Sequence, residues 1–159
     1  MDIMTPPERW ETVNEKLLQP CHIFDLFKRR CKHPKNNKEG DFYLLKTNDW
    51  VQCLALTPDD RLIVVQQYRF GVDDLCWEFA GGIIHPGEDP AHTALRELEE
   101  ETGYKGERAI YLNGCYTEPA ILNNQCHFIL IEGCVPNGTL NWDENEEIAV
   151  AALKWDEVL

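Results

Sequence analysis

The segment between residues 82 and 104 constrains the fold of this chain more than any other part of the sequence. Asp89 is a natural N-cap, and Pro90 suits the first position of a helix because an N–H group would be unpaired there. Gly103 can adopt the left-handed backbone conformation that ends a helix. The segment therefore predicts a loop that leads into a helix over residues 90–102.

This helix is expected to have two faces of different character, because successive residues are rotated by about 100°. The stripe that can face a core comprises Ala91, Leu95, Leu98 and Thr102. A separate face carries three glutamates within one turn: Glu97, Glu100 and Glu101. Like charges four residues apart, such as Glu97 and Glu101, oppose helix formation by about 0.2–0.5 kcal/mol. Arg96, four residues before Glu100, is the only local counter-charge.

A hard divalent cation would remove the repulsion on this acidic face. Such cations prefer oxygen ligands, so the spacing of the three glutamates indicates a Mg²⁺ site that would also engage a substrate diphosphate. The alternative is an acidic helix face that is only solvated, since charged helix faces are common.

A longer sequence pattern includes these glutamates. It runs without a gap from Gly82 through five residues to Glu88, then seven residues, then Arg96-Glu97-Leu98-x-Glu100-Glu101-x-Gly103-Tyr104. This pattern resembles the complete Nudix box. Tyr104 fills a place usually taken by an aliphatic residue and still provides an apolar body. The resemblance implies the Nudix fold: an α/β fold, with a mixed β-sheet in an α/β/α sandwich and the box helix against one face.

The resemblance also implies a chemistry, which is the hydrolysis of a nucleoside diphosphate linked to another group, with Mg²⁺ or Mn²⁺ as cofactor. Carried over by position, Glu97 and Glu101 would be the main metal ligands, with Glu100 as a third and the carbonyl of Gly81 completing the set. The chemistry is consistent with these residues, because cations neutralise diphosphate oxygens and lower the pKa of an attacking water.

Four box residues are expected to shape the site rather than to contact the substrate: Gly82, Glu88, Arg96 and Gly103. Glu88 and Arg96 are interpreted as an ion pair that holds the loop on the helix and so orients the ligands. Gly81 and Gly82 let the backbone approach metal and phosphate without an intervening side chain.

Three segments outside the box resemble the ADP-ribose and nucleotide-sugar pyrophosphatase branch of the same family. They are Gln67-Tyr68-Arg69, Trp77-Glu78-Phe79-Ala80-Gly81-Gly82 and Glu118-Pro119-Ala120. A proline at the distance of Pro119 from the box is the usual marker of this branch, although Ala120 stands where a glycine is often found.

Substrate contacts are expected from four residues: Arg69, Glu78, Arg30 and Pro119. Arg69 could hold the diphosphate or the terminal ribose. The alternative for Arg69 is a solvated arginine at the end of a strand, where charged side chains are usually exposed.

The general base is expected in the acidic loop over residues 143–147, with Glu147 the first candidate and Glu144 the second. Carboxylates that are committed to metal are poor acceptors for a water proton, so the base should come from outside the main ligand set. The resemblance supports this loop, since ADP-ribose hydrolases of the family often supply a glutamate from it. The alternatives are Glu100 or Glu97 within the box, and a loop that is an ordinary solvated turn.

Composition limits the possible partners. A chain of 159 residues is expected to form one domain, residues 1–159. The net charge of −13 argues against a partner held through nucleic-acid phosphates, because that binding needs a basic surface. No apolar run approaches the ~18 residues of a membrane span, and the N-terminus lacks the pattern of a signal peptide. The expected location is therefore cytoplasmic, with no membrane partner.

The seven cysteines are expected to be reduced and mostly buried thiols. Their number is odd and no CxxC motif occurs, so the sequence favours neither a disulfide framework nor a zinc ribbon.

Apolar spacing and turn signals predict strands on both sides of the helix. These strands are expected over residues 42–46, 50–56, 61–68, 75–80, 108–116, 125–134 and 148–154. Residues 1–9 resemble a loose end. The family commonly continues into a second helix after the last strand, which here is expected to be short or cut away.

An N-terminal β-ribbon is expected within residues 10–45, with arms from Trp10 to Leu18 and from Cys21 to Cys31. A two-stranded ribbon is marginal alone, and the branch that this chain resembles commonly exchanges this part between subunits. We therefore expect a homodimer in which the basic run at residues 28–35 lies near the partner's acidic site, with Arg30 as the phosphate contact. The alternative is a solvated edge strand whose lysines discourage aggregation.

These expectations combine into one function, the Mg²⁺-dependent hydrolysis of ADP-ribose to AMP and ribose 5-phosphate. Another nucleotide sugar, such as GDP-mannose, is the alternative within this class. A catalytically silent Nudix-fold module that binds a nucleotide, or an acidic interaction protein without a ligand, is an alternative from a different class. The unbroken acid set favours the enzyme, since binding alone does not require a metal-activated water.

Overall fold

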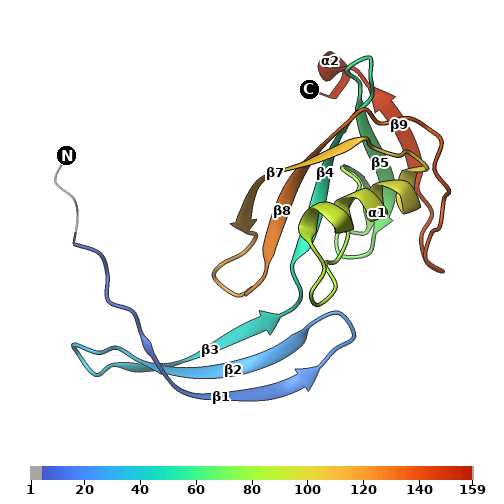
Figure 1. Ribbon diagram of the computed structural model, residues 1–159. Helices are drawn as coiled ribbons and strands as arrows, with labels where there is room; N and C mark the ends of the chain where they lie inside the picture. The colour runs from blue at the N-terminus through green and yellow to red at the C-terminus, as the bar shows by residue number, and fades with distance from the viewer. Residues whose placement is uncertain (1–4, 159) are drawn as a thin grey trace. The chain divides into compact units, whose positions relative to one another are not determined.

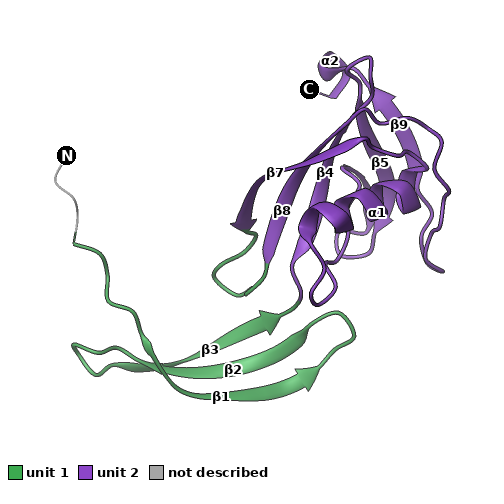
Figure 2. Ribbon diagram, viewed as in Figure 1, with its two compact units in different colours: residues 1–47, 116–124 green, residues 48–115, 125–159 purple. Residues whose placement is uncertain are grey.

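The computed structural model describes residues 5–158 (Figure 1). Residues 1–4, part of the expected loose N-terminal end, and Leu159 lie outside the described residues. The chain divides into two compact units. Unit 1 comprises residues 1–47 and 116–124, and unit 2 comprises residues 48–115 and 125–159 (Figure 2).

Unit 1 contains an antiparallel sheet of three strands, not the two-stranded ribbon that the sequence predicts. The strands are β1 (Glu11–Pro20), β2 (Asp25–Lys32) and β3 (Glu39–Lys46), in the order β1-β2-β3. The short strand predicted over residues 42–46 begins earlier in the structure, at Glu39. Its added residues place Glu39 opposite Lys32 and Asp41 opposite Arg30, and opposite charges on facing residues favour strand pairing.

The basic run lies on the central strand of this sheet, so the interpretation of the run as a solvated edge strand is wrong. Lys28 contacts Asp41 at 2.8 Å, and Arg29 contacts Glu15 at 2.6 Å. Because acids of both neighbouring strands face these residues, Lys28, Arg29 and Arg30 are paired across the sheet.

Unit 2 is built on a mixed sheet of six strands with one long helix. Its elements are β4 (Trp50–Leu56), β5 (Leu62–Arg69), β6 (Asp74–Glu78), α1 (Pro90–Thr102), β7 (Arg108–Tyr116), β8 (Gln125–Glu132), β9 (Ala149–Leu153) and α2 (Trp155–Val158). The order is β6-β5-β4-β8-β7, and β9 pairs with β5. The pair β4–β8 is parallel, whereas β5 is antiparallel to β4, β6 and β9. These elements agree with the predicted ones within a few residues.

The core lies where α1 packs on β4 and β8. Alternate residues of these two strands are fully buried, and Leu98 of α1 is buried against them: Val51, Cys53, Ala55, Ile129 and Ile131. The continuous run from Leu62 to Val65 is also buried, as expected of a strand covered on both faces.

Helices lie on both faces of the sheet. Gln52 alternates with the buried residues of β4 and so points away from α1. On that second face, Gln52, Val64 and Leu153 share a groove with Glu157 and Val158 at the short helix α2. The arrangement agrees with the predicted α/β/α sandwich. Within residues 5–158, no helix is both long and apolar enough to cross a membrane.

The caps of α1 confirm the sequence prediction, and its buried face is wider than the predicted stripe. Asp89 accepts hydrogen bonds from the backbone N–H groups of Ala91 and His92, and Gly103 is left-handed with φ of 71°. Of the predicted stripe, Leu98 and Thr102 are buried, and Ala91 and Leu95 are partly buried against the core. Thr93, Ala94 and Glu101 are buried in addition. The stripe was assigned mainly from apolarity, which gave no reason to include a buried glutamate.

Candidate active site

The glycine loop at residues 80–84 is pressed between β4 and α1. Its backbone pairs with β4 through the N–H of Cys53 on the carbonyl of Ala80 (2.8 Å) and the N–H of Val51 on the carbonyl of Gly82 (2.9 Å). A Cβ on Gly81 would lie 2.1 Å from the carbonyl oxygen of Val51, and one on Gly82 would lie 2.3 Å from the carboxylate of Glu97. Position 81 therefore requires glycine, because the obstructing atom belongs to the backbone, whereas a side chain at position 82 would displace the carboxylate of Glu97.

Glu101 is buried, with only 4% of its surface exposed. The alternative of an acidic helix face that is only solvated therefore does not describe this residue. The backbone N–H of Gly81 donates to its Oε2 at 3.0 Å. Burial raises the pKa of Glu101 to about 8; the Gly81 hydrogen bond and Arg69 oppose the rise, and the charges of Glu97 and Glu146 add to it. The site thus holds a carboxyl group whose charged form is costly.

Arg96 connects the loop to the acidic helix. Its guanidinium donates to both oxygens of Glu88 at 3.2 and 3.3 Å, and to Glu97 and Glu100 at 2.9 Å each. Arg96 holds the pKa of Glu88 at about 2. The pKa of Glu97 is raised, because burial outweighs the nearby Arg96. Arg96 therefore orients Glu97 and Glu100 as well as fixing the loop through Glu88.

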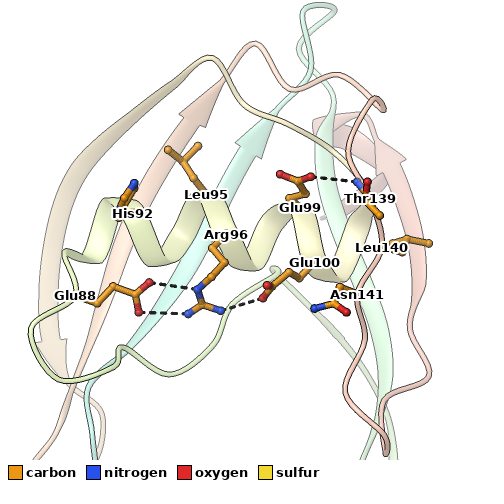
Figure 3. A pocket seen from close by; sticks show the side chains of 9 residues that line it. All are labelled: Glu88, His92, Leu95, Arg96, Glu99, Glu100, Thr139, Leu140 and Asn141. Carbon is orange, nitrogen blue, oxygen red and sulfur yellow. Dashed lines mark hydrogen bonds and ion pairs between the residues drawn. The ribbon is translucent and has the colours of Figure 1, made fainter.

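A cavity of about 920 Å³ gathers most of the predicted site residues. From the box and the glycine loop it is lined by Gly81, Gly82, Arg96, Glu97, Glu100 and Glu101, and from β5 and β6 by Arg69 and Glu78. A smaller cavity of about 650 Å³ lies beside α1 and shares Arg96, Glu100 and Asn141 with the first (Figure 3).

Arg69 and Glu78 form a two-bonded ion pair on the wall of the larger cavity. The Nε and Nη2 atoms of Arg69 donate to the two oxygens of Glu78 at 2.7 and 2.6 Å. This pairing raises the pKa of Arg69. Because a guanidinium has five N–H donors, Arg69 keeps donors free while Glu78 fixes its plane.

In the acidic loop the structure singles out Glu146. Glu146 and Asp143 line the cavity, whereas the candidate bases Glu147 and Glu144 are exposed and do not. The Oε2 atom of Glu146 accepts the backbone N–H of Asp143 at 2.8 Å. The sequence reasoning passed over Glu146, although its spacing of three residues from Asp143 resembles the reciprocal bond of a capping box.

Two expected substrate contacts belong to unit 1, and the residues that line the cavity all belong to unit 2. Arg30 is bound to Glu39 at 2.9 Å and to Asp41 at 3.1 Å. Pro119 is exposed in a turn in which the carbonyl of Glu118 accepts the N–H of Leu122 at 2.7 Å.

The residues fit a hard divalent cation in their chemistry. Within the described residues no three His, Cys, Asp or Glu side chains are already arranged as a ligand cluster. The donors are nevertheless oxygen atoms, and burial opposes the charge of Glu101 and Glu97. A cation beside them would favour the ionised forms. Glu97, Glu101, Glu100 and the Gly81 carbonyl could hold it.

Comparison with known proteins extends these observations. The ADP-ribose pyrophosphatase of Bacillus subtilis (strain 168) is 29% identical over 150 residues, which cover 94% of this chain and 80% of that protein. The ADP-sugar pyrophosphatase of Mus musculus is 40% identical over 83 residues, 52% of this chain and 35% of that protein. The similarity thus includes proteins named as ADP-ribose and ADP-sugar pyrophosphatases.

A solved structure and a family model agree with the fold. The crystal structure of an ADP compounds hydrolase superposes with a TM-score of 0.85 and covers 96% of this chain and 82% of its own, at 20% identity, which shows the fold alone. The family model of the NUDIX domain matches residues 47–159. This match contains every residue that lines the acidic cavity. The chain therefore belongs to the Nudix hydrolase family.

Proposed function

We propose that this protein hydrolyses the diphosphate bond of a nucleoside diphosphate sugar, and that ADP-ribose is cleaved to AMP and ribose 5-phosphate. The observation that carries the proposal is the cavity in which Glu97, Glu100 and Glu101 lie together with Arg69. A diphosphate needs cations on its oxygens, and its sugar and nucleoside need space beyond them. The similarity to ADP-ribose pyrophosphatases favours this substrate class.

We propose that Glu97, Glu101, Glu100 and the carbonyl of Gly81 hold Mg²⁺, with Mn²⁺ as a substitute. When bound, the cation would neutralise diphosphate oxygens and make a bound water more acidic. Arg96 orients Glu97 and Glu100. The free donors of Arg69 would bind a phosphate or ribose oxygen, with Glu78 fixing the guanidinium.

We propose Glu146 as the general base, ahead of Glu147 and Glu144. Its Oε2 accepts the N–H of Asp143, which leaves Oε1 to accept a proton from the attacking water. Glu146 lines the cavity, and its charge raises the pKa of both Glu97 and Glu101. Its place in the same cavity as Glu97 and Glu101 supports a role in activating a water held there.

The direct test is a panel of nucleoside diphosphate sugars, dinucleotides and nucleoside triphosphates with Mg²⁺, with the products resolved by chromatography. ADP-ribose or a related sugar nucleotide should be turned over well ahead of ATP and GTP. Faster turnover of GDP-mannose would identify it as the preferred sugar nucleotide in place of ADP-ribose. Faster turnover of triphosphates would contradict the proposed substrate class. Saturable binding without turnover would identify a silent binding module instead.

We also propose a homodimer in which unit 1 packs on the partner subunit and brings Arg30 near the partner's cavity. Nearly every residue of β1 is exposed, and unit 1 displays many exposed large apolar side chains. They are Trp10, Val13, Leu17, Leu18, Ile23, Phe42, Tyr43, Tyr116 and Ile121. Such a surface usually marks an interaction site. Sedimentation should show a dimer at micromolar concentration, and a fully active monomer would contradict the proposal.

A further inference from the structure

The last turn of α1 is capped by a segment far away in the sequence, residues 138–142. The final carbonyls of an α-helix have no partner within the helix. Here the backbone N–H of Gly138 donates to the carbonyl of Gly103 at 2.8 Å, and that of Asn141 to the carbonyl of Glu100 at 2.9 Å. The indole Nε1–H of Trp142 donates to the carbonyl of Glu101 at 3.0 Å. Two of these carbonyls belong to proposed metal ligands.

Two further contacts hold this segment on the helix. The backbone N–H of Thr139 donates to the carboxylate of Glu99 at 3.2 Å (Figure 3). A Cβ on Gly138 would lie 2.9 Å from the carbonyl oxygen of Gly103 and 2.9 Å from the Cγ of Glu99. The segment can therefore approach the helix only because residue 138 is glycine.

The Trp142 bond is the last of these contacts before the acidic loop begins at Asp143. The next bond along the chain joins Asp143 to Glu146, at 2.8 Å between the N–H and Oε2. Trp142 is 38% exposed and is not a core residue. Trp142 is thus bonded to Glu101 on the helix, and its neighbour Asp143 is bonded to Glu146. Together the two hydrogen bonds connect the helix to the loop carboxylate that lines the cavity.

We propose that Trp142 is a positioning residue, whose indole N–H couples the acidic loop to the end of the metal-binding helix and so holds Glu146 in the cavity. The coupling to catalysis rests on the proposed function. The docking of the loop does not rest on it.

The test compares Trp142→Phe, which removes the N–H and keeps an aromatic ring, with the matched control Trp155→Phe on α2. Loop docking is measured without substrate, by cleavage of the folded, chelator-treated protein with a Glu-specific protease. Trp142→Phe should speed cleavage at residues 144–147 by about three- to tenfold, the population shift expected from the loss of one hydrogen bond. Trp155→Phe should be cleaved there like the natural protein. Gly138→Ala should also speed cleavage, because it displaces the same segment.

Kinetics with ADP-ribose and saturating Mg²⁺ provide the second measurement. Trp142→Phe should lower kcat by about three- to tenfold with KM changed less than twofold, because a base that is less often in place slows the reaction without weakening substrate binding. Equal cleavage and equal kcat in the two Phe variants would overturn the proposal. A lower melting temperature of Trp142→Phe with unchanged loop cleavage and kcat would also overturn it, since it would show a structural role only. If the natural protein turns over no substrate, the proposed function fails. The protease experiment would still show whether Trp142 holds the acidic loop on the helix.

Discussion

Unit 1 and unit 2 each contain a cluster of like charges, and the two clusters are compensated in opposite ways. In unit 1 the cations of β2 face acids on both neighbouring strands, with Lys28 and Arg30 on Asp41 and Arg29 on Glu15. Hydrogen bonds from Lys46 and Arg29 hold the pKa of Glu15 below its usual value, and hydrogen bonds from Lys28 and Arg30 do the same for Asp41. Each of these three cations has a carboxylate partner near the surface, where ion pairs contribute little to stability.

In unit 2 the acids of α1 outnumber its cations, and two of these acids, Glu97 and Glu101, are largely buried. Burial raises the pKa of Glu97 and Glu101, and Glu146 adds a further negative charge. Arg96 is shared among Glu88, Glu97 and Glu100 and does not hydrogen-bond to Glu101.

The difference distinguishes a structural charge cluster from a functional one. The cations of β2 are paired with acids on the neighbouring strands. The buried acids of α1 lack such pairing in full, so their charged forms lower the stability of the fold. Groups with pKa values shifted by burial and like charge gather at functional sites, and the cation that we propose for this site would supply the missing compensation.

The largest expected effect comes from removing an acid of the α1 cluster. Glu97→Gln and Glu101→Gln should each lower the rate of ADP-ribose hydrolysis by about 10³-fold or more, because each loses a ligand charge for the cation. The overall fold should remain, as judged by circular dichroism. Glu132→Gln, a surface acid that contacts Arg108 at 3.5 Å, is the matched control and should keep its activity. Near-normal turnover in both α1 variants would contradict the metal site.

The next effect tests which loop carboxylate acts on the water. Glu146→Gln should lower kcat by about 10²–10⁴-fold, the range for a general base, and should lose the acidic limb of the pH–rate profile. Glu144→Gln and Glu147→Gln should each lose less than about tenfold. Raising Mg²⁺ should not restore Glu146→Gln, whereas a ligand variant should recover part of its rate. A large loss in Glu147→Gln alone would return the role to the residue that the sequence favoured.

A smaller effect concerns stability in the absence of metal. The pKa of Glu101 in the folded protein, about 8, lies above that of an unfolded glutamate. Between these two values the folded state binds more protons than the unfolded state, so stability should fall as pH rises from about 4.3 to 8. Glu101→Gln should flatten this fall and stabilise the chelator-treated protein at pH 8 by on the order of 2 kcal/mol. Denaturant unfolding at pH 5 and pH 8 measures it, and a variant less stable at pH 8 would contradict the proposed cost of the buried charge.

The smallest effect is expected in the β2 cluster. Lys28→Gln should change the free energy of unfolding little and leave kcat unchanged, because the ion pair is exposed and its partner Asp41 also contacts Arg30. A loss of several kcal/mol would remove the contrast between the two clusters. Arg30→Gln in parallel tests the expected phosphate contact, which predicts a higher KM with little change in stability.

Much of unit 2 could be predicted from sequence because its signals are local. The caps of α1 depend on Asp89, Pro90 and Gly103, each of which acts within a turn of its own position. The spacing of the box glutamates likewise follows from the period of a helix. These short-range rules were enough to place the acidic helix α1 and the loop before it.

The tertiary structure decided what depends on distant partners. Glu101 is buried because Gly81, twenty residues earlier, offers it a backbone N–H. Glu146 rather than Glu147 lines the cavity because of how the loop turns at Asp143. Trp142 caps a helix forty-one residues before it. Residue type and spacing fixed which groups could do chemistry, but burial and long-range hydrogen bonds chose among them, since both arise only when separate segments pack together.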